Sequence, residues 1–141
     1  WCRAQRLADP PTITAQRIAG DDLAPSGDVR RLLGVGRDEP IGYRHVRLSC
    51  GGKVLSVAHN WYVPARLTPE MNRILDSTDT PFGRVAASLR FTRQPLAEPR
   101  ARLPACPPGT ILAHRARLLL ADGQPLSLLV ECYTRGNLSA R

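Results

Sequence analysis

The sequence predicts an α+β fold in which an antiparallel β-sheet carries helices packed on one face. Two observations predict the sheet: one pair of strand-like runs flanks the Gly-Gly dipeptide at 51–52, and a second pair flanks the Asp-Gly dipeptide at 122–123. Both dipeptides are typical of tight hairpin turns, and the second is typical of a type I′ turn. A third observation predicts the helices, because helix-start signals lie between the hairpins at Thr68 and Thr80.

The two helix-start signals have the same chemistry. Thr68 suits an N-cap, and the Pro-Glu pair that follows it suits the first turn of a helix. We therefore predict a helix over residues 69–75. Thr80 before Pro81 repeats the signal and predicts a second helix over 81–90.

The two hairpins match each other when one is shifted along the chain by 71 residues, from position 44 to position 115. The shift aligns six positions in about twenty, among them Arg44 with Arg115. It also makes Asn60 the counterpart of Glu131, near the end of the second strand of each hairpin. An internal repeat is predicted, in which these two polar side chains could converge on one space.

The length of 141 residues predicts a single domain over 1–141, and 43% apolar with 23% charged residues is ordinary for a folded protein. Prolines and glycines interrupt the first forty residues, so we expect residues 1–40 to wrap the sheet irregularly, with a short strand at 12–19 and a helical turn at 29–33. No apolar run approaches the roughly 20 residues of a membrane helix. The chain starts at Trp1, so we expect its natural start to be missing.

Cysteine and histidine spacing predicts no metal site. The four cysteines lie far apart, with no C-x-x-C pair and no His at ligand spacing, at Cys2, Cys50, Cys106 and Cys132. Buried free thiols are the expected state, and two long-range disulfides are the alternative if the chain is exported. We expect a cytoplasmic protein that needs no metal and no organic cofactor, and the oligomeric state stays open.

The charge balance favours an anionic partner. The net charge is +8, and Lys53 is the only lysine among twenty basic residues. Guanidinium groups bind planar carboxylates and phosphates through two parallel hydrogen bonds. Nucleic acid is not the expected partner, because the arginines are dispersed, few aromatic residues lie between them and no recognised binding module occurs.

Glu131 is the first candidate for chemistry. It lies in the strand-like run "LSLLVECYT", where alternate residues form one wholly apolar face and Glu131 belongs to the other, mixed face. One interpretation places Glu131 in solvent on a half-buried strand. The other places it in a dry cavity, where it could give or take a proton near neutral pH.

Two further groups could bind an anion. Arg44 shares a strand face with apolar neighbours, so it needs an anion unless it reaches water at the mouth of the sheet. The helix that begins after Thr80 would present the backbone N–H groups of Phe82, Gly83 and Arg84. Together with Glu131, these groups could form a site for a small carboxylate.

The chain resembles the chorismate pyruvate-lyase superfamily, which includes the ligand-sensing domains of GntR-type transcription regulators. The resemblance covers residues 43–133 and depends on five segments in this order: "RHVRLSCGG", "VAHNWYVP", "TDTPFGRV", "FTR" and "RARLLLADGQPLSLLVE". It implies a six-stranded antiparallel sheet with helices over one face and a closed pocket between them.

The resemblance also implies roles for residues. Arg44 would bind a substrate carboxylate, a backbone amide at Phe82 and Gly83 would contact the ligand, and Glu131 would transfer a proton. The sequence departs from the lyase where the family has a second Arg in the first hairpin. His59 or Asn60 aligns there, and Asn60 can form hydrogen bonds to a ligand but cannot neutralise it.

Two functions follow from this resemblance. In the first, the protein eliminates pyruvate from chorismate or a related enol ether and leaves 4-hydroxybenzoate, which requires two held carboxylates and one proton transfer. In the second, a domain of the same fold binds or senses a small aromatic carboxylate without turnover. Both functions predict a small anionic aromatic ligand, and steeply salt-dependent binding to DNA or RNA would instead indicate a nucleic-acid binder.

Overall fold

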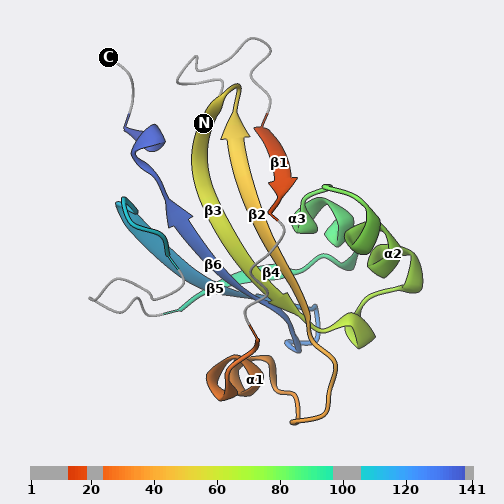
Figure 1. Ribbon diagram of the computed structural model, residues 1–141. Coiled ribbons are helices and arrows are strands. Elements are labelled where there is room, and N and C mark those ends of the chain that lie inside the picture. Colours follow the sequence, from red (N-terminus) through yellow and green to blue (C-terminus); the bar gives the residue numbers. More distant parts are fainter. Residues whose placement is uncertain (1–12, 19–23, 97–105, 139–141) are drawn as a thin grey trace.

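The computed structural model describes residues 13–18, 24–96 and 106–138, and one six-stranded sheet organises them (Figure 1). Neighbouring strands are all antiparallel, in the order β1-β2-β3-β6-β5-β4. The predicted α+β fold with an antiparallel sheet is therefore confirmed. The strands are β1 (Ile13–Arg17), β2 (Gly42–Cys50), β3 (Lys53–Tyr62), β4 (Thr92–Pro95), β5 (Leu112–Leu119) and β6 (Pro125–Tyr133).

Both predicted hairpins form, but the second turn differs from the predicted type. Gly123 has φ +86°, and its N–H donates to the carbonyl of Leu120 over 2.8 Å. A type I′ turn also needs positive φ at the residue before glycine, whereas Arg90 is the one non-glycine residue with positive φ in the described part of the chain. The type I′ prediction is wrong. The side chain of Asp122 accepts the N–H of Gln124, and the loop between Leu120 and Gln124 has three residues and ends in a left-handed glycine.

The predicted repeat holds for the second strands of the hairpins but not for the first. Arg44 pairs with Asn60 across β2 and β3, whereas Arg115 pairs with Val130 across β5 and β6. The two hairpins thus differ by one residue in register. Because side chains alternate along a strand, Arg44 and Arg115 lie on opposite faces of the sheet.

The helices are α1 (Gly27–Leu33), α2 (Pro69–Ser77) and α3 (Phe82–Val85), with 3₁₀ turns η1 (Pro64–Arg66), η2 (Ala87–Leu89) and η3 (Arg135–Asn137). Thr68 is the predicted N-cap of α2, since its hydroxyl accepts the N–H of Met71 over 3.2 Å. The helix predicted over 81–90 is instead split into α3 and η2. Pro81 precedes α3 and offers no side-chain cap, while Thr80 accepts a hydrogen bond from the Thr78 hydroxyl.

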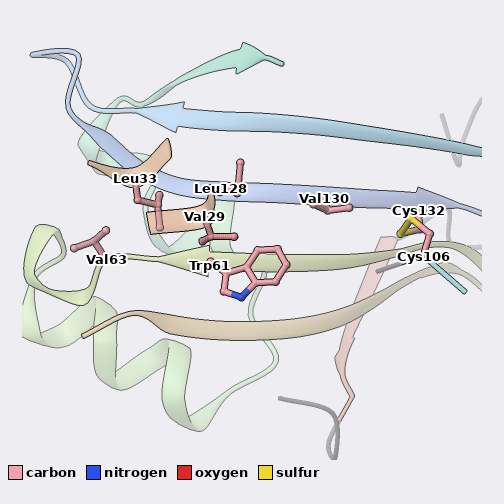
Figure 2. Packing of buried hydrophobic residues seen from close by; sticks show 8 residues of the cluster. All are labelled: Val29, Leu33, Trp61, Val63, Cys106, Leu128, Val130 and Cys132. Carbon is pink, nitrogen blue, oxygen red and sulfur yellow. A yellow bond between two sulfur atoms is a disulfide. The ribbon is translucent and has the colours of Figure 1, made fainter. Parts of the chain in front are cut away.

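The face of the sheet with Trp61 carries α1. Val29 and Leu33 of α1 pack against β-strand residues in a buried cluster of eight, which Figure 2 shows: Val29, Leu33, Trp61, Val63, Cys106, Leu128, Val130 and Cys132. The first forty residues were expected to wrap the sheet, yet this part of them enters the core. Residues 1–12 and 19–23, which belong to the same predicted segment, lie outside the described residues.

The opposite face carries α2 and α3, as predicted for the helices between the hairpins. Their buried residues form a second cluster with the sheet: Tyr62, Leu67, Met71, Leu75, Phe82, Ala86, Leu118 and Leu126. The centroids of the Tyr62 and Phe82 rings lie 5.4 Å apart, which joins α3 to the end of β3. This packing covers the part of the face beneath α2 and α3. None of the described helices is both long enough and apolar enough to span a membrane.

The expected free thiols are replaced by disulfides. Cys106 bonds to Cys132 with their Cα atoms 5.5 Å apart, and Cys50 is also disulfide-bonded. Cys106 precedes β5 in the chain, and the N–H of Ile111 donates to the carbonyl of Tyr133 over 2.9 Å. This pairing brings the start of β5 back beside the end of β6, a proximity that cysteine spacing in the sequence does not reveal.

Gly42 is a position where the fold leaves no room for a side chain. It pairs with Tyr62, and a Cβ at Gly42 would lie 2.3 Å from the Tyr62 ring. Because that ring is buried in the core, we expect Gly42→Ala to lower the free energy of unfolding by about 1–3 kcal/mol. Gly52→Ala is the control, since a Cβ there meets nothing within 4 Å. If urea denaturation gave the same loss of unfolding free energy for both variants, the close contact between Gly42 and the Tyr62 ring would not be the cause.

Candidate functional site

A cavity of about 540 Å³ opens on the sheet face that carries Glu131. Strand register builds it from two rows of side chains. One row crosses four strands through Leu48, Ser56, Tyr133 and Leu112, and the next contains Glu131, paired with His114. The full described lining comes from strands, from Ile111 and from η3: Ile13, Leu48, Leu55, Ser56, Ile111, Leu112, His114, Glu131, Tyr133 and Asn137.

The family resemblance implies a closed pocket between the sheet and the helices, whereas this cavity lies elsewhere on the sheet. Its described lining includes no residue of α2 or α3. The space beneath those helices is filled by the cluster around Tyr62 and Phe82. The cavity instead lies on the part of the same face beyond α2 and α3.

The rim of the cavity is apolar and exposed. Ile13, Ile111 and Leu112 are 42%, 41% and 47% exposed, and they make up three of the four large hydrophobic residues that are exposed in the described chain. Exposed apolar groups gathered around a hollow are typical of binding sites. A volume of several hundred Å³ with few polar groups suits a small organic molecule.

Glu131 lies in the wall of this cavity and is largely shielded from solvent. Its side chain is 14% exposed, which excludes the interpretation of a fully solvated carboxylate. Arg93 Nη1 donates to Oε1 over 2.9 Å, and the Tyr133 hydroxyl donates to Oε2 over 2.7 Å. The His114 and Tyr133 rings pack edge to face, with their centroids 5.3 Å apart. Glu131 therefore belongs to a polar cluster at one side of an otherwise apolar hollow.

Arg44 is buried, which excludes the alternative that it reaches water at the mouth of the sheet, and its partners are backbone carbonyls. It is 4% exposed, and its two Nη groups donate to the carbonyls of Thr80 over 2.9 Å and Thr78 over 3.0 Å. Burial, and then the nearby charge of Arg17, lower the pKa of Arg44. Arg17 donates to the carbonyls of Leu75 and Asp76 in the same way. Arg17 thus caps the end of α2, whereas Arg44 holds the segment between α2 and α3 and is not among the described lining of the cavity.

The predicted backbone site at Phe82, Gly83 and Arg84 does not have the expected form. Helix α3 has four residues, and the N–H of Arg84 already donates to the carbonyl of Pro81 over 3.0 Å. Phe82 is buried in the second cluster and Gly83 is exposed. Their role as a ligand contact remains a prediction. None of the three is among the described lining of the cavity that contains Glu131.

Asn60 lies between Arg44 and Glu131 on the same face of the sheet. It is 5% exposed, pairs with Arg44 across β2 and β3, and pairs with Leu129 across β3 and β6. Glu131 is two residues beyond Leu129, so Asn60 and Glu131 are diagonal neighbours on one face. The structure therefore brings Asn60 beside Arg44 and near Glu131, while only Glu131 of the three is among the described lining of the cavity.

Sequence reasoning did not identify Arg93, Tyr133 or His114 as part of the site. Tyr133 and His114 could have been found from strand alternation, because both share the face of Glu131 once the register is known. Arg93 belongs to the quoted segment "FTR", but β4 is four residues long and shows no alternation that would direct its side chains.

Comparison with known proteins supports the fold. No family model matches the chain. It is 48% identical over 157 aligned residues to the uncharacterized protein y4mC of Sinorhizobium fredii, a match that covers 98% of this chain and 66% of that protein. The chain thus spans just under two thirds of the length of this relative.

Solved structures with the same architecture share little sequence with the chain. The C-terminal domain of the histidine utilization repressor from Pseudomonas syringae superposes with a TM-score of 0.64 at 13% identity, covering 92% of this chain and 95% of that one. The ligand-binding domain of a protein assigned to the GntR family of transcriptional regulators, from Bordetella bronchiseptica, gives a TM-score of 0.62 at 14% identity, covering 86% and 82%. The possible transcriptional regulator YydK from Bacillus subtilis gives 0.56 at 20% identity, covering 86% and 58%.

These structures agree with the six-stranded antiparallel sheet, its hairpins and the few helices on it. The chain has the fold of the ligand-binding domains of GntR-family regulators, which is the chorismate lyase-like fold.

Proposed function

We propose that this chain is a ligand-binding domain whose cavity holds a small hydroxylated aromatic molecule against Glu131. The observation that carries the proposal is the hollow of about 540 Å³, in which apolar walls surround one shielded and hydrogen-bonded carboxylate. The fold is that of domains such as the ligand-binding domain from Bordetella bronchiseptica, which supports binding rather than turnover.

The chemistry of the walls defines the ligand. Leu48, Leu55 and Leu112 offer apolar surface to a ring. Each oxygen of Glu131 can accept more than one hydrogen bond, so the carboxylate can accept a ligand hydroxyl while it holds Arg93 and Tyr133. A net charge of +8 favours a ligand that carries a carboxylate elsewhere on the ring. The anionic aromatic ligand expected from the sequence fits this description.

A lyase that acts on chorismate is the second candidate, and the position of Glu131 is the observation that favours it. A shielded carboxylate beside the Tyr133 hydroxyl could transfer one proton during elimination of pyruvate. The elimination also needs both substrate carboxylates to be held. Arg44, which the family resemblance assigns to one of them, donates to Thr78 and Thr80 instead. We therefore favour binding without turnover.

Replacing Glu131 tests the hydroxyl contact. We expect calorimetry to show that the wild type binds 4-hydroxybenzoate more tightly than benzoate, because only the former donates to the carboxylate. Glu131→Met should weaken 4-hydroxybenzoate about tenfold, the value of one charge-assisted hydrogen bond, and leave benzoate nearly unchanged. Glu70→Gln, an exposed position on α2, is the matched control.

A coupled assay separates binding from catalysis. Chorismate is incubated with the protein, and pyruvate is followed by its reduction with lactate dehydrogenase. Binding of 4-hydroxybenzoate without pyruvate release supports the ligand-binding domain. Pyruvate release that disappears in Glu131→Gln would make the protein a lyase, and failure to bind either benzoate would remove the proposed ligand class.

A further inference from the structure

Arg93 reaches Glu131 from an edge strand of the sheet. It lies on β4 and pairs with Leu118 of β5, whereas Glu131 of β6 pairs with His114 of β5. Its contact with Glu131 therefore crosses β5 diagonally, and the guanidinium is placed at a carboxylate that lines the cavity. Arg93 is not itself among the described lining of the cavity, but its guanidinium contacts a carboxylate that is.

The guanidinium of Arg93 has donors to spare. Arginine has five N–H donors, and the contact with Glu131 is made by Nη1. The Arg93 side chain is 42% exposed. Arg44 differs, because it is 4% exposed and both of its Nη groups donate to carbonyls. Arg93 thus presents exposed donors beside Glu131, whereas both Nη groups of Arg44 donate to the segment between α2 and α3.

We infer that Arg93 is the specificity-determining residue that binds the carboxylate of the ligand, while Glu131 accepts a hydrogen bond from a donor on the neighbouring atom. This inference rests on the proposed ligand-binding function. The cation and the acceptor are 2.9 Å apart, so the two ligand groups that they recognise must also lie side by side. The ligand class is an apolar carboxylate with an adjacent hydroxyl or amino group, of which 2-hydroxybenzoate is the simplest aromatic example.

The charges support this assignment. A ligand carboxylate placed against Glu131 alone would be repelled. In the proposed complex, Arg93 lies between the carboxylates of Glu131 and the ligand and can form charge-assisted hydrogen bonds to both. The ligand hydroxyl or ammonium gives Glu131 a further donor. The Tyr133 hydroxyl keeps its bond to the other oxygen of Glu131, so the cluster stays in place when the ligand binds.

The test compares three ligands and three variants by calorimetry. The ligands are 2-hydroxybenzoate, its 4-hydroxy isomer and 2-methylphenol, which keeps the ring and the hydroxyl but has no charge. We expect the wild type to bind 2-hydroxybenzoate most tightly. Arg93→Gln should weaken 2-hydroxybenzoate about tenfold and 2-methylphenol less than twofold, and Arg93→Lys should retain part of the affinity for the acid. Arg73→Gln, an exposed position on α2, should match the wild type.

Two results would overturn the role of Arg93 while the proposed function stands: tighter binding of the 4-hydroxy isomer by the wild type, or equal weakening of 2-hydroxybenzoate and 2-methylphenol in Arg93→Gln. Binding of 2-methylphenol to Arg93→Gln at wild-type affinity shows that this variant is folded. A wild type that binds none of the three ligands would remove the proposed function and this inference together.

Discussion

Replacing Arg44 with methionine is expected to lower the free energy of unfolding by about 2–4 kcal/mol, because two part-buried, charge-assisted hydrogen bonds disappear and the carbonyls of Thr78 and Thr80 lose a donor. Methionine keeps most of the length of the side chain, so the loss reports the polar contacts more than the packing. These two hydrogen bonds hold the segment between α2 and α3 against β2. Urea denaturation measures the loss, and hydrogen exchange over residues 78–86 should become faster before the rest of the sheet is affected.

Arg47→Met is the matched control for this variant. Arg47 lies three residues further along β2 and pairs with Val57, and its Nη1 donates to the exposed side chain of Gln16 over 3.3 Å. An exposed contact of this kind is worth little, so we expect a change within about 0.5 kcal/mol. If Arg44→Met were as stable as Arg47→Met, the carbonyl contacts would not hold the α2–α3 link.

Removing the disulfide between Cys106 and Cys132 is expected to have an effect of similar size. The two cysteines are 26 residues apart in the sequence, and closing a loop of that length stabilises a folded chain by roughly 3–4 kcal/mol through the unfolded state. The double variant Cys106→Ala/Cys132→Ala, unfolded by urea without reductant, measures this effect. A reducing agent on the wild type would be less specific, because Cys50 is also disulfide-bonded.

Peptide mapping under non-reducing conditions checks the premise of that experiment. Proteolysis of the wild type should release one cross-linked peptide that contains Cys106 and Cys132. Recovery of both as separate, alkylated peptides would contradict the disulfide. A double variant as stable as the cross-linked wild type would show instead that the buried core around Cys132 holds this end of the sheet without the bond.

The sheet was predictable from local sequence because its two hairpins depend on short-range signals. The Gly-Gly and Asp-Gly turns and the alternation of strand residues need no information from distant parts of the chain. Helix α2 was predictable for the same reason, since Thr68 caps it. Helix α1 was expected only as a turn, because seven residues give little periodicity and its burial depends on Trp61 and Leu128, which lie far away in the sequence.

The site was only partly predictable, because its contacts cross the sheet. Alternation was enough to separate Glu131 from the apolar face of β6, but it left open whether Arg44 is buried or reaches water. What Arg44 contacts could not be read from its strand, since its partners lie in a loop more than thirty residues later. Arg93 reaches Glu131 only because β4 joins the edge of β5, which no local pattern predicts.

The one-residue offset in pairing between the hairpins limits what can be exchanged between the two halves of the molecule. Arg115 corresponds to Arg44 in the sequence, yet it faces α1, where its Nη1 lies 3.8 Å from a carboxylate oxygen of Asp28. Transplanting a side chain from the first strand of one hairpin to the aligned place in the other would deliver it to the wrong side of the sheet. Engineering a second cavity like the one at Glu131 into the other hairpin would therefore require a shift in strand register before any residue is changed.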